Sequence, residues 1–214
     1  MSDLKTELTK ELSHLVNGLS FDVSAEQIDK LVGYVLLMDK WNKTYNLSSV
    51  RDPHEMLIKH ILDSIVVTPY LQGSNIADVG TGPGLPGIPL AIMCVNKNFT
   101  LIDSLGKRIR FIKQAIHELN ISNVVPIQAR VETLEAKQFN IIVSRAFASL
   151  SDMLFWCEHL VADDGRFYAL KGQLRKEELD QVPAQFKIES SLPLSVPSLE
   201  GERHLVKIIK QPLM

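Results

Sequence analysis

The segment from Ile76 to Ile92, IADVGTGPGLPGIPLAI, constrains the fold more than any other part of the sequence. A short apolar run ends at Asp78 and Val79, glycines follow at alternate positions, and a helix is predicted to open near Gly87. Such glycines let the backbone approach a ligand closely, and the start of a helix offers free N–H groups. The pattern therefore predicts a strand, a tight turn and a helix that form a binding site. The turn glycines are Gly80, Gly82 and Gly84.

Short apolar runs alternate with helical periodicity from about residue 74 onward. Helical repeats occupy 108–119 and 151–161. Strands that alternate with helices predict an α/β fold with right-handed crossovers, a parallel sheet, and ligands at the carboxyl ends of its strands. The strand candidates are 75–79, 99–102, 124–128, 139–143 and 166–170, and a closing antiparallel pair is predicted at 186–194 and 203–210.

The first seventy residues are predicted to be helical. Ser24 and Gln27 form a capping-box signature, and Pro53 is expected at the start of a further helix. We expect a helical extension over 1–70 and an α/β domain over 71–214, packed as one unit.

The composition excludes several classes of protein. A chain of 214 residues with 45% hydrophobic and 22% charged residues is neither disordered nor collagen-like, and two cysteines in apolar runs do not form a disulfide scaffold. The N-terminal residues are charged where a secretory signal is apolar. Residues 79–96 carry no charge, but their glycines and prolines break a membrane helix. We expect a cytoplasmic protein without a membrane segment.

Two acidic residues flank the glycine turn. Asp78 precedes it directly, and Asp103 ends the next strand roughly twenty residues further on. A carboxylate at the turn attracts an ammonium or sulfonium group, and a second can accept both ribose hydroxyls, which suits S-adenosylmethionine. Alternatively, Asp78 caps the turn and Asp103 caps the following helix. The pattern GxGxxG read from Gly82 also fits a dinucleotide, so an NAD(P)-dependent oxidoreductase is an alternative.

Only the middle third of the chain is net positive, with 8 basic and 5 acidic residues over 76–150. Its cationic patch includes Lys107, Arg108 and Arg130. Such a patch can bind the phosphates of a nucleic acid, although a solvated helix face gives the same pattern. We predict these three residues as RNA contacts, and a non-catalytic RNA-binding assembly factor is a second alternative.

Seven strings give the chain a resemblance to a known family. Besides the glycine turn, they are WNKTYNLSS (41–49), HILDSI (60–65), LIDSLGKRIRFI (101–112), ARVE (129–132), VSRAFASL (143–150) and ALKG (169–172). They resemble the bacterial RsmG family, also called GidB, whose members methylate guanine N7 in small-subunit ribosomal RNA. The resemblance extends from Trp41 to the last strand, with Asn140 as a departure where many relatives have Asp.

The resemblance implies a class I S-adenosylmethionine-dependent methyltransferase fold, Rossmann-like, with a mostly parallel seven-stranded sheet and an N-terminal helical extension. It implies methylation of guanine 527, in the standard numbering, in the decoding-region loop of 16S rRNA. The partner is then ribosomal RNA or the small ribosomal subunit, and we expect a monomer. Carried over by motif, the implied cofactor contacts are Gly80, Leu85, Asp103, Val131, Glu132 and Arg145, to which Asp78, Gly82 and Gly84 are added from the turn.

The expected chemistry needs positioning rather than proton transfer. Guanine N7 is a ring lone pair without a proton, so no general base is required. Arg145 is predicted to position the base or close the cofactor site, with a structural salt bridge as the alternative. SRAF stands where an Asn/Asp-Pro-Pro-aromatic motif would indicate methylation of exocyclic amines. Cys157 falls on the inward face of a helix, which disfavours cytosine C5 chemistry.

The remaining candidate residues each allow two interpretations. Phe147 is predicted either to stack on an extruded guanine or to pack in the core. Lys171, at a predicted strand end, either holds a phosphate or is a surface charge. Trp41 is expected to anchor the extension to the core. His60 and Asp63 lie three residues apart on one helix face, and we predict a hydrogen-bonded pair rather than a metal site.

Overall fold

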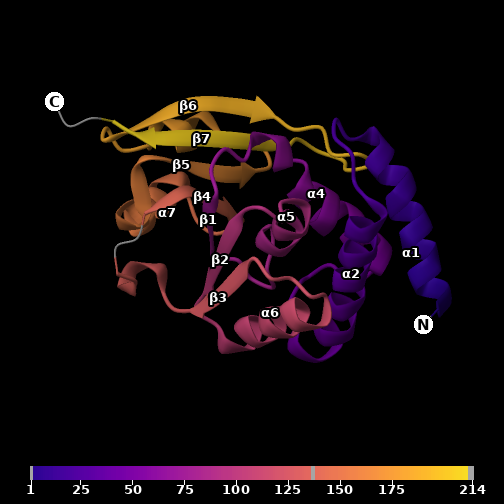
Figure 1. The fold of residues 1–214 in the computed structure, drawn as a ribbon. Coiled ribbons are helices and arrows are strands. Elements are labelled where there is room, and N and C mark those ends of the chain that lie inside the picture. Colours follow the sequence, from indigo (N-terminus) through magenta and orange to yellow (C-terminus); the bar gives the residue numbers. More distant parts are fainter. Residues whose placement is uncertain (1, 136–137, 212–214) are drawn as a thin grey trace.

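A seven-stranded sheet forms the centre of the structure, a computed structural model that describes residues 2–135 and 138–211 (Figure 1). The order within these residues is β3-β2-β1-β4-β5-β7-β6. Strands β1 to β5 run parallel, whereas β7 runs antiparallel to both β5 and β6. The predicted parallel sheet with a closing antiparallel pair is confirmed. The strands are β1 (Asn75–Val79), β2 (Asn98–Asp103), β3 (Val124–Gln128), β4 (Phe139–Arg145), β5 (Val161–Lys171), β6 (Phe186–Pro193) and β7 (His204–Lys210).

The direction of strand order reverses beside β1. In register, Ile76 lies opposite Phe99 of β2 on one side and Ile141 of β4 on the other. The connection from β1 leads to β2 on one side, and the chain reaches β4 on the other side only after β3, which opens a crevice at the carboxyl ends of β1 and β4. Both clefts described below open at this edge.

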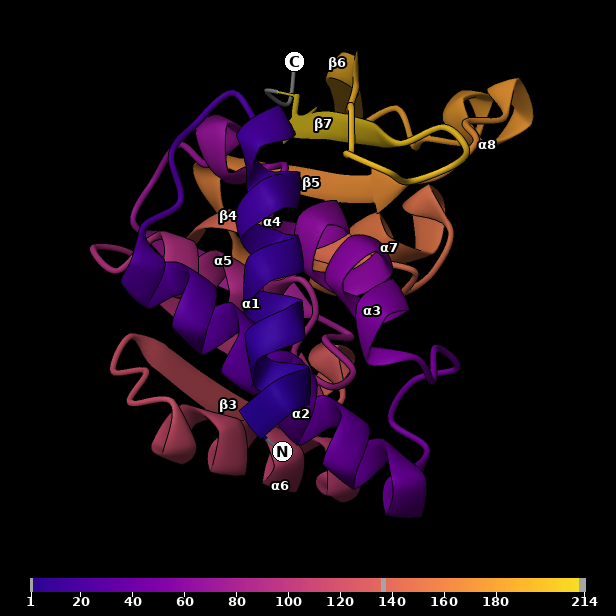
Figure 2. The ribbon, with the colours of Figure 1, turned by 90° about the vertical axis from the view of Figure 1, so that its right-hand side faces the viewer.

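Helices cover both faces of the sheet. Figure 1 shows α7 on one side and α2, α4 and α5 on the other, and Figure 2 shows α1 outermost at the N-terminal end. The helices are α1 (Ser2–Leu15), α2 (Ala25–Tyr45), α3 (Pro53–Met56), α4 (Asp63–Ile65), α5 (Gly87–Met93), α6 (Gly106–Glu118), α7 (Leu150–Cys157) and α8 (Lys176–Asp180), with a π-helical turn η2 (Leu57–Leu62) and short 3₁₀ turns η1 (Val16–Gly18), η3 (Thr68–Tyr70), η4 (Val131–Thr133) and η5 (Glu158–Leu160).

The N-terminal helices share one apolar core with the sheet. Leu31 of α2 and Leu90 of α5 belong to the same buried cluster. Trp41 packs its ring edge-on against Phe111 of α6 at 5.6 Å, which confirms its predicted anchoring role. The capping box is also confirmed, because the Ser24 hydroxyl accepts from the Gln27 N–H and the Gln27 side chain accepts from the Ser24 N–H. The proposed boundary between 1–70 and 71–214 stays a prediction.

Two segments differ from the sequence-based expectations. The helix predicted for 151–161 ends at Cys157, and Val161 already pairs with Phe139 across β4 and β5. Leu160 and Val161 are apolar and fit either a helical or a strand period, so periodicity alone did not separate them. The short helix α8 was not predicted.

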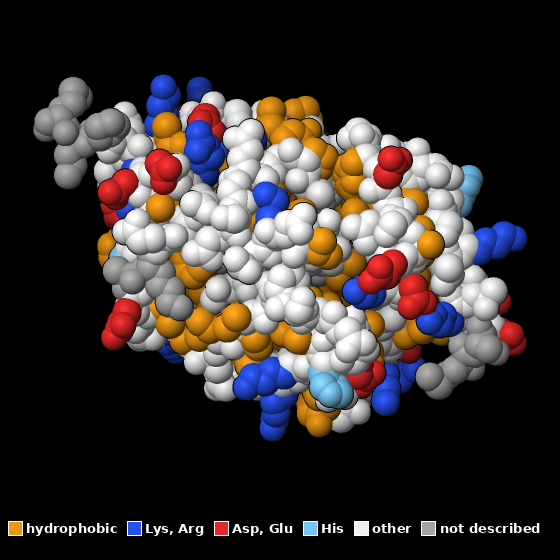
Figure 3. All heavy atoms as spheres, in the orientation of Figure 1, with side chains coloured by type: hydrophobic (Ala, Val, Ile, Leu, Met, Phe, Trp, Pro, Cys, Tyr) orange, Lys and Arg blue, Asp and Glu red, His pale blue; other side chains and the backbone are white. Residues whose placement is uncertain are grey.

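The face in Figure 3 carries intermixed basic and acidic side chains, in keeping with a formal net charge of −2. Within the described residues, no helix is both long and apolar enough to cross a membrane.

Candidate functional site

Two neighbouring clefts open at the carboxyl edge of the sheet. The turn cleft has a volume of about 390 Å³ and lies over the ends of β1, β2 and β3. The basic cleft has a volume of about 680 Å³ and lies between the glycine turn, the ends of β4 and β5, and the helical segment 53–65. Gly80, Arg108 and Ala146 line both clefts, so the two spaces adjoin.

The glycine turn has the backbone that its sequence predicts. Gly80, Gly82 and Gly84 have φ angles of +64°, +61° and +103°, a region that favours glycine. A Cβ on Gly80 would lie 2.0 Å from Cδ2 of Phe147, whereas a Cβ on Gly82 would meet nothing within 4 Å. The turn thus packs tightly at its first glycine and leaves room for a ligand at its second.

Asp78 supports the turn from the protein interior. One carboxyl oxygen, Oδ2, accepts hydrogen bonds from Thr81 Oγ1 at 2.5 Å and from the Gly87 N–H at 2.8 Å. Its other oxygen is buried without a hydrogen-bond partner among the described residues. Burial raises the pKa of Asp78 to about 7. Asp78 lines neither cleft, so the structure has it in the capping arrangement, and direct contact with a cofactor stays a prediction.

Asp103 lies at the wall of the turn cleft. Its Oδ1 accepts from the Leu105 N–H at 2.9 Å, and its Oδ2 accepts from the Gly82 N–H at 2.9 Å and from Arg108 Nη1 at 3.0 Å. The two backbone bonds hold the carboxylate beside the glycine turn. This arrangement brings the second predicted acid to the ligand space.

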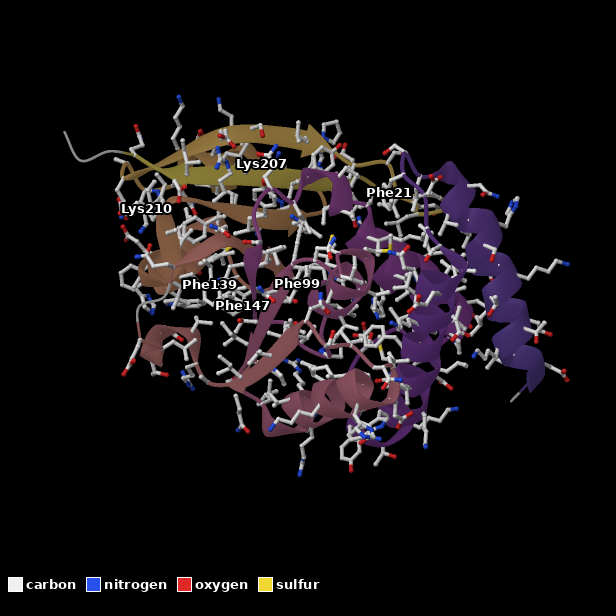
Figure 4. The ribbon with its side chains drawn as sticks, viewed as in Figure 1. Phe21, Phe99, Phe139, Phe147, Lys207 and Lys210 are labelled. Atoms are coloured by element: carbon white, nitrogen blue, oxygen red, sulfur yellow. The ribbon has the colours of Figure 1, made fainter. Side chains whose placement is uncertain are left out.

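The far wall of the turn cleft comes from the segment after β3. Arg130, Val131 and Glu132 all line it, with Val131 buried and the other two exposed. Phe147, labelled in Figure 4, is half-buried and packs edge-on against Trp156 at 5.7 Å. Phe147 therefore forms a wall of the turn cleft, and its stacking on a base stays a prediction.

A π-helical turn prepares the position of Arg145. The Asp63 N–H bonds Ile58 O, five residues earlier, rather than Lys59 O. Lys59 O instead accepts from Arg145 Nη1 at 2.9 Å, and Asp63 Oδ2 accepts from the same nitrogen at 2.9 Å. Asp63 Oδ1 accepts from Arg203 Nε at 2.8 Å. A single buried carboxylate thus links two arginines at the basic cleft.

The prediction that His60 and Asp63 form a hydrogen bond with each other is wrong. His60 Nε2 bonds Ser48 Oγ at 2.7 Å, and Asp63 is occupied by the two arginines. Burial and the nearby Arg145 lower the pKa of His60 to about 4, so its ring is neutral at pH 7. Among the described residues, no three His, Cys, Asp or Glu side chains are grouped to hold a metal ion.

The predicted RNA contacts lie in different places. Lys171 lines the basic cleft and donates to Ala148 O at 3.0 Å and to Glu178 at 2.6 Å. Arg108 lines both clefts and Arg130 only the turn cleft, whereas Lys107 lines neither and donates to Tyr45 O at 3.0 Å. Lys59 and Arg203 also line the basic cleft and were not predicted, because no motif recognised in the sequence marks either. The charged residues of the basic cleft are Lys59, Asp63, Arg108, Arg145, Lys171, Glu200 and Arg203.

Cys157 lies in the apolar core on the opposite face of the sheet from α2. Burial raises the pKa of its thiol to about 12, so it supplies no thiolate at neutral pH. Cytosine C5 chemistry through this residue is excluded.

Comparisons with known proteins agree on one family. Residues 27–206 match the family model GidB, described as rRNA small subunit methyltransferase G. The chain is 58% identical to the ribosomal RNA small subunit methyltransferase G of Photobacterium profundum, covering 93% of this chain and 97% of the relative. It is 57% identical to the protein of that name in Klebsiella pneumoniae, covering 94% and 98%.

Solved structures share the fold at low sequence identity. A SAM-dependent methyltransferase from Aquifex aeolicus matches with a TM-score of 0.57 and 14% identity, over 76% of this chain and 96% of that chain. Magnesium protoporphyrin IX methyltransferase from Synechocystis, with bound SAM, matches with a TM-score of 0.54 and 14% identity, over 83% and 97%. These likenesses show the class I methyltransferase fold.

Proposed function

Because the chain belongs to the GidB family of rRNA small subunit methyltransferase G, we propose that it methylates N7 of guanine 527 in 16S rRNA with S-adenosylmethionine as the methyl donor. The observation that supports this function in the molecule is the junction of the two clefts at Gly80 and Ala146. The turn cleft presents the fixed carboxylate of Asp103, and the basic cleft presents cations beside the glycine turn. A nucleoside cofactor and a polyanionic substrate would therefore meet at one edge of the sheet.

The turn cleft fits the cofactor through its own residues. Asp103 accepts from the ribose hydroxyls, and Val131 and Glu132 flank the adenine. Asp78 holds the turn in place from the interior. When bound, S-adenosylmethionine supplies an electrophilic methyl group. Of the predicted turn residues, Gly80 lines this cleft, whereas Gly82 and Leu85 line the adjoining basic cleft and Gly84 lines neither, so cofactor contact by these three stays a prediction.

The basic cleft fits the guanine and its flanking phosphates. Guanine N7 needs no deprotonation, so the protein has to orient the base and exclude water. The described bonds of Arg145 use Nη1, which leaves Nε and Nη2 to donate to guanine O6. Because Asp63 and Lys59 O hold Arg145, this orientation requires little reorganisation. Lys171 and Arg108 are placed to neutralise phosphates.

We further propose that the protein acts as a monomer in the cytoplasm on ribosomal RNA of the small subunit. The ribosomal RNA in the names of the relatives supports the substrate in this assignment.

The experiment that tests the function is transfer of labelled methyl groups to small subunits from a strain that lacks the enzyme, followed by mapping of the modified base. We expect one label at guanine N7, and none on subunits from the parent strain because their site is already methylated. RNA binding without transfer would instead support an assembly factor. Binding of NAD without binding of S-adenosylmethionine would support an oxidoreductase.

A further inference from the structure

The side chain of Arg108 stands between the two clefts. It lines both of them, and its Nη1 lies 3.0 Å from Asp103 Oδ2. About a third of the Arg108 side chain is exposed, against 3% of the Asp103 side chain. Arg108 Nε is buried and has no hydrogen-bond partner among the described residues. The guanidinium is thus held at Asp103 by one nitrogen rather than by a bidentate fork.

Asp103 keeps its position without Arg108. The Leu105 N–H donates to Oδ1, and the Gly82 N–H donates to Oδ2, each at 2.9 Å. Both donors belong to the backbone of turns, so they stay when a side chain moves. Removing Arg108 leaves a fixed carboxylate with acceptor capacity facing the turn cleft.

Ribose and Arg108 compete for the same acceptor sites. A carboxylate offers about four lone-pair sites, and the backbone and Arg108 already use three of them at Asp103. A ribose that donates both hydroxyls needs two sites, so one existing bond has to break. The bond to the Arg108 side chain is the one that breaks without deforming a turn.

We propose that Arg108 couples the two clefts: the cofactor ribose displaces it from Asp103, and it then binds an RNA phosphate in the basic cleft. This inference rests on the proposed function and adds to it a coupling between cofactor binding and RNA binding. The displacement is a side-chain rotation, because the residue already borders both spaces. Cofactor and RNA then strengthen each other's binding by the same factor, since coupling between two sites is reciprocal.

The test measures binding rather than turnover. S-adenosylhomocysteine, the demethylated product, is titrated by calorimetry into the wild type, R108A and the control R110A, whose side chain is exposed on the same helix and lines neither cleft. We expect R108A to bind S-adenosylhomocysteine about fivefold more tightly, because a partly exposed ion pair no longer competes. We expect R110A to match the wild type.

The second measurement is binding of unmethylated 16S rRNA with and without S-adenosylhomocysteine. The wild type and R110A should bind RNA several-fold more tightly with it, and R108A should show weaker binding and no enhancement. R108Q, which keeps a side chain of similar polarity without the charge, replaces R108A if the latter fails to fold. Unchanged or weaker cofactor binding by the folded variant, or no enhancement in the wild type, would overturn the coupling. In either case, methyl transfer by the wild type shows that the proposed function itself stands.

Discussion

The turn cleft and the basic cleft are built by different means. The turn cleft is lined by residues at or just after the ends of β1, β2, β3 and β4 and by Trp156, and two backbone N–H groups fix its Asp103 carboxylate. The basic cleft depends on ion pairs between distant parts of the chain, since 82 residues separate Asp63 from Arg145 and 140 separate it from Arg203. Backbone bonds near strand ends therefore prepare the cofactor side, whereas the RNA side requires the complete tertiary fold.

The largest effect is expected beneath the turn cleft, in the pH dependence of stability. Burial raises the pKa of Asp78 from 3.8 to about 7, so the folded chain keeps a proton that the unfolded chain releases between pH 4 and pH 7. The protonated Asp78 carboxyl therefore adds to the free energy of unfolding. This stabilisation is complete below about pH 4 and is lost as the pH rises to about 7, a change of about 4 kcal/mol. Asp78→Asn does not titrate, so the wild type should lose that stability relative to the variant over this range.

Denaturant titrations at a series of pH values measure this difference in the free energy of unfolding. His60, whose pKa is lowered to about 4, acts in the opposite sense but is present in both proteins and cancels. A difference that stays constant with pH would show that Asp78 is already charged in the folded chain.

In the basic cleft, Arg145→Ala should lower turnover by about 10² to 10³, the usual cost of losing one positioned donor. The variant also leaves Asp63 with Arg203 alone. Single-turnover methyl transfer at saturating cofactor measures the loss, with calorimetry to confirm that the cofactor still binds. Full activity of the variant would show that Arg145 forms only a structural ion pair and does not position the base.

In the turn cleft, Asp103→Ala should weaken cofactor binding by about 10², because two hydrogen bonds to a charged acceptor are lost at about 1.5 kcal/mol each. Calorimetry with S-adenosylmethionine measures the change, and Asp103→Asn, which keeps one acceptor oxygen, should fall between the variant and the wild type. Equal affinity in all three proteins would show that Asp103 does not contact the cofactor.

A smaller change is expected from charge reversal at Lys107 and Arg108. With S-adenosylhomocysteine bound, the double variant to Glu should bind RNA about tenfold less tightly and show a salt slope that is shallower by about 1.4, since each lost contact with a single strand removes about 0.7. Reversal of Arg110 and Lys113, exposed on the same helix, is the matched control. If both double variants show the same slope, the effect reflects net charge rather than these two positions.

The smallest effect is expected at Cys157, outside both clefts. Cys157→Ala removes one buried sulfur and should leave turnover within about twofold, with a loss of stability near 1 kcal/mol. Methyl transfer and thermal unfolding measure the two quantities. A large loss of turnover at unchanged stability would be evidence for thiol chemistry.

The glycine turn was largely predictable because its chemistry is local. Glycines with left-handed backbone, an acid at a strand end and the following helix all lie within one strand–turn–helix unit. The arrangement of Asp78 was open between two interpretations, since a carboxylate before a turn can face a ligand or cap the backbone. Which of the two roles Asp78 has depends on how deeply its carboxyl group is buried, and the neighbouring strands determine that burial.

The basic cleft was predicted only in part. Arg145 was predicted from the family resemblance and Lys171 because it follows a predicted strand, but Arg203 directly precedes β7 and no local motif marks it. The partner of Asp63 was predicted wrongly because helical spacing of three residues suggested His60. The π-helical turn and two arginines that are distant in the sequence give Asp63 other partners.

The ion pair between Asp63 and Arg203 has a consequence for local unfolding. Arg203 directly precedes β7, which pairs with both β5 and β6. If the β6–β7 hairpin opens locally while the parallel strands stay folded, Asp63 keeps Arg145 but loses its second arginine. The stability of this hairpin therefore sets how often the basic cleft is complete.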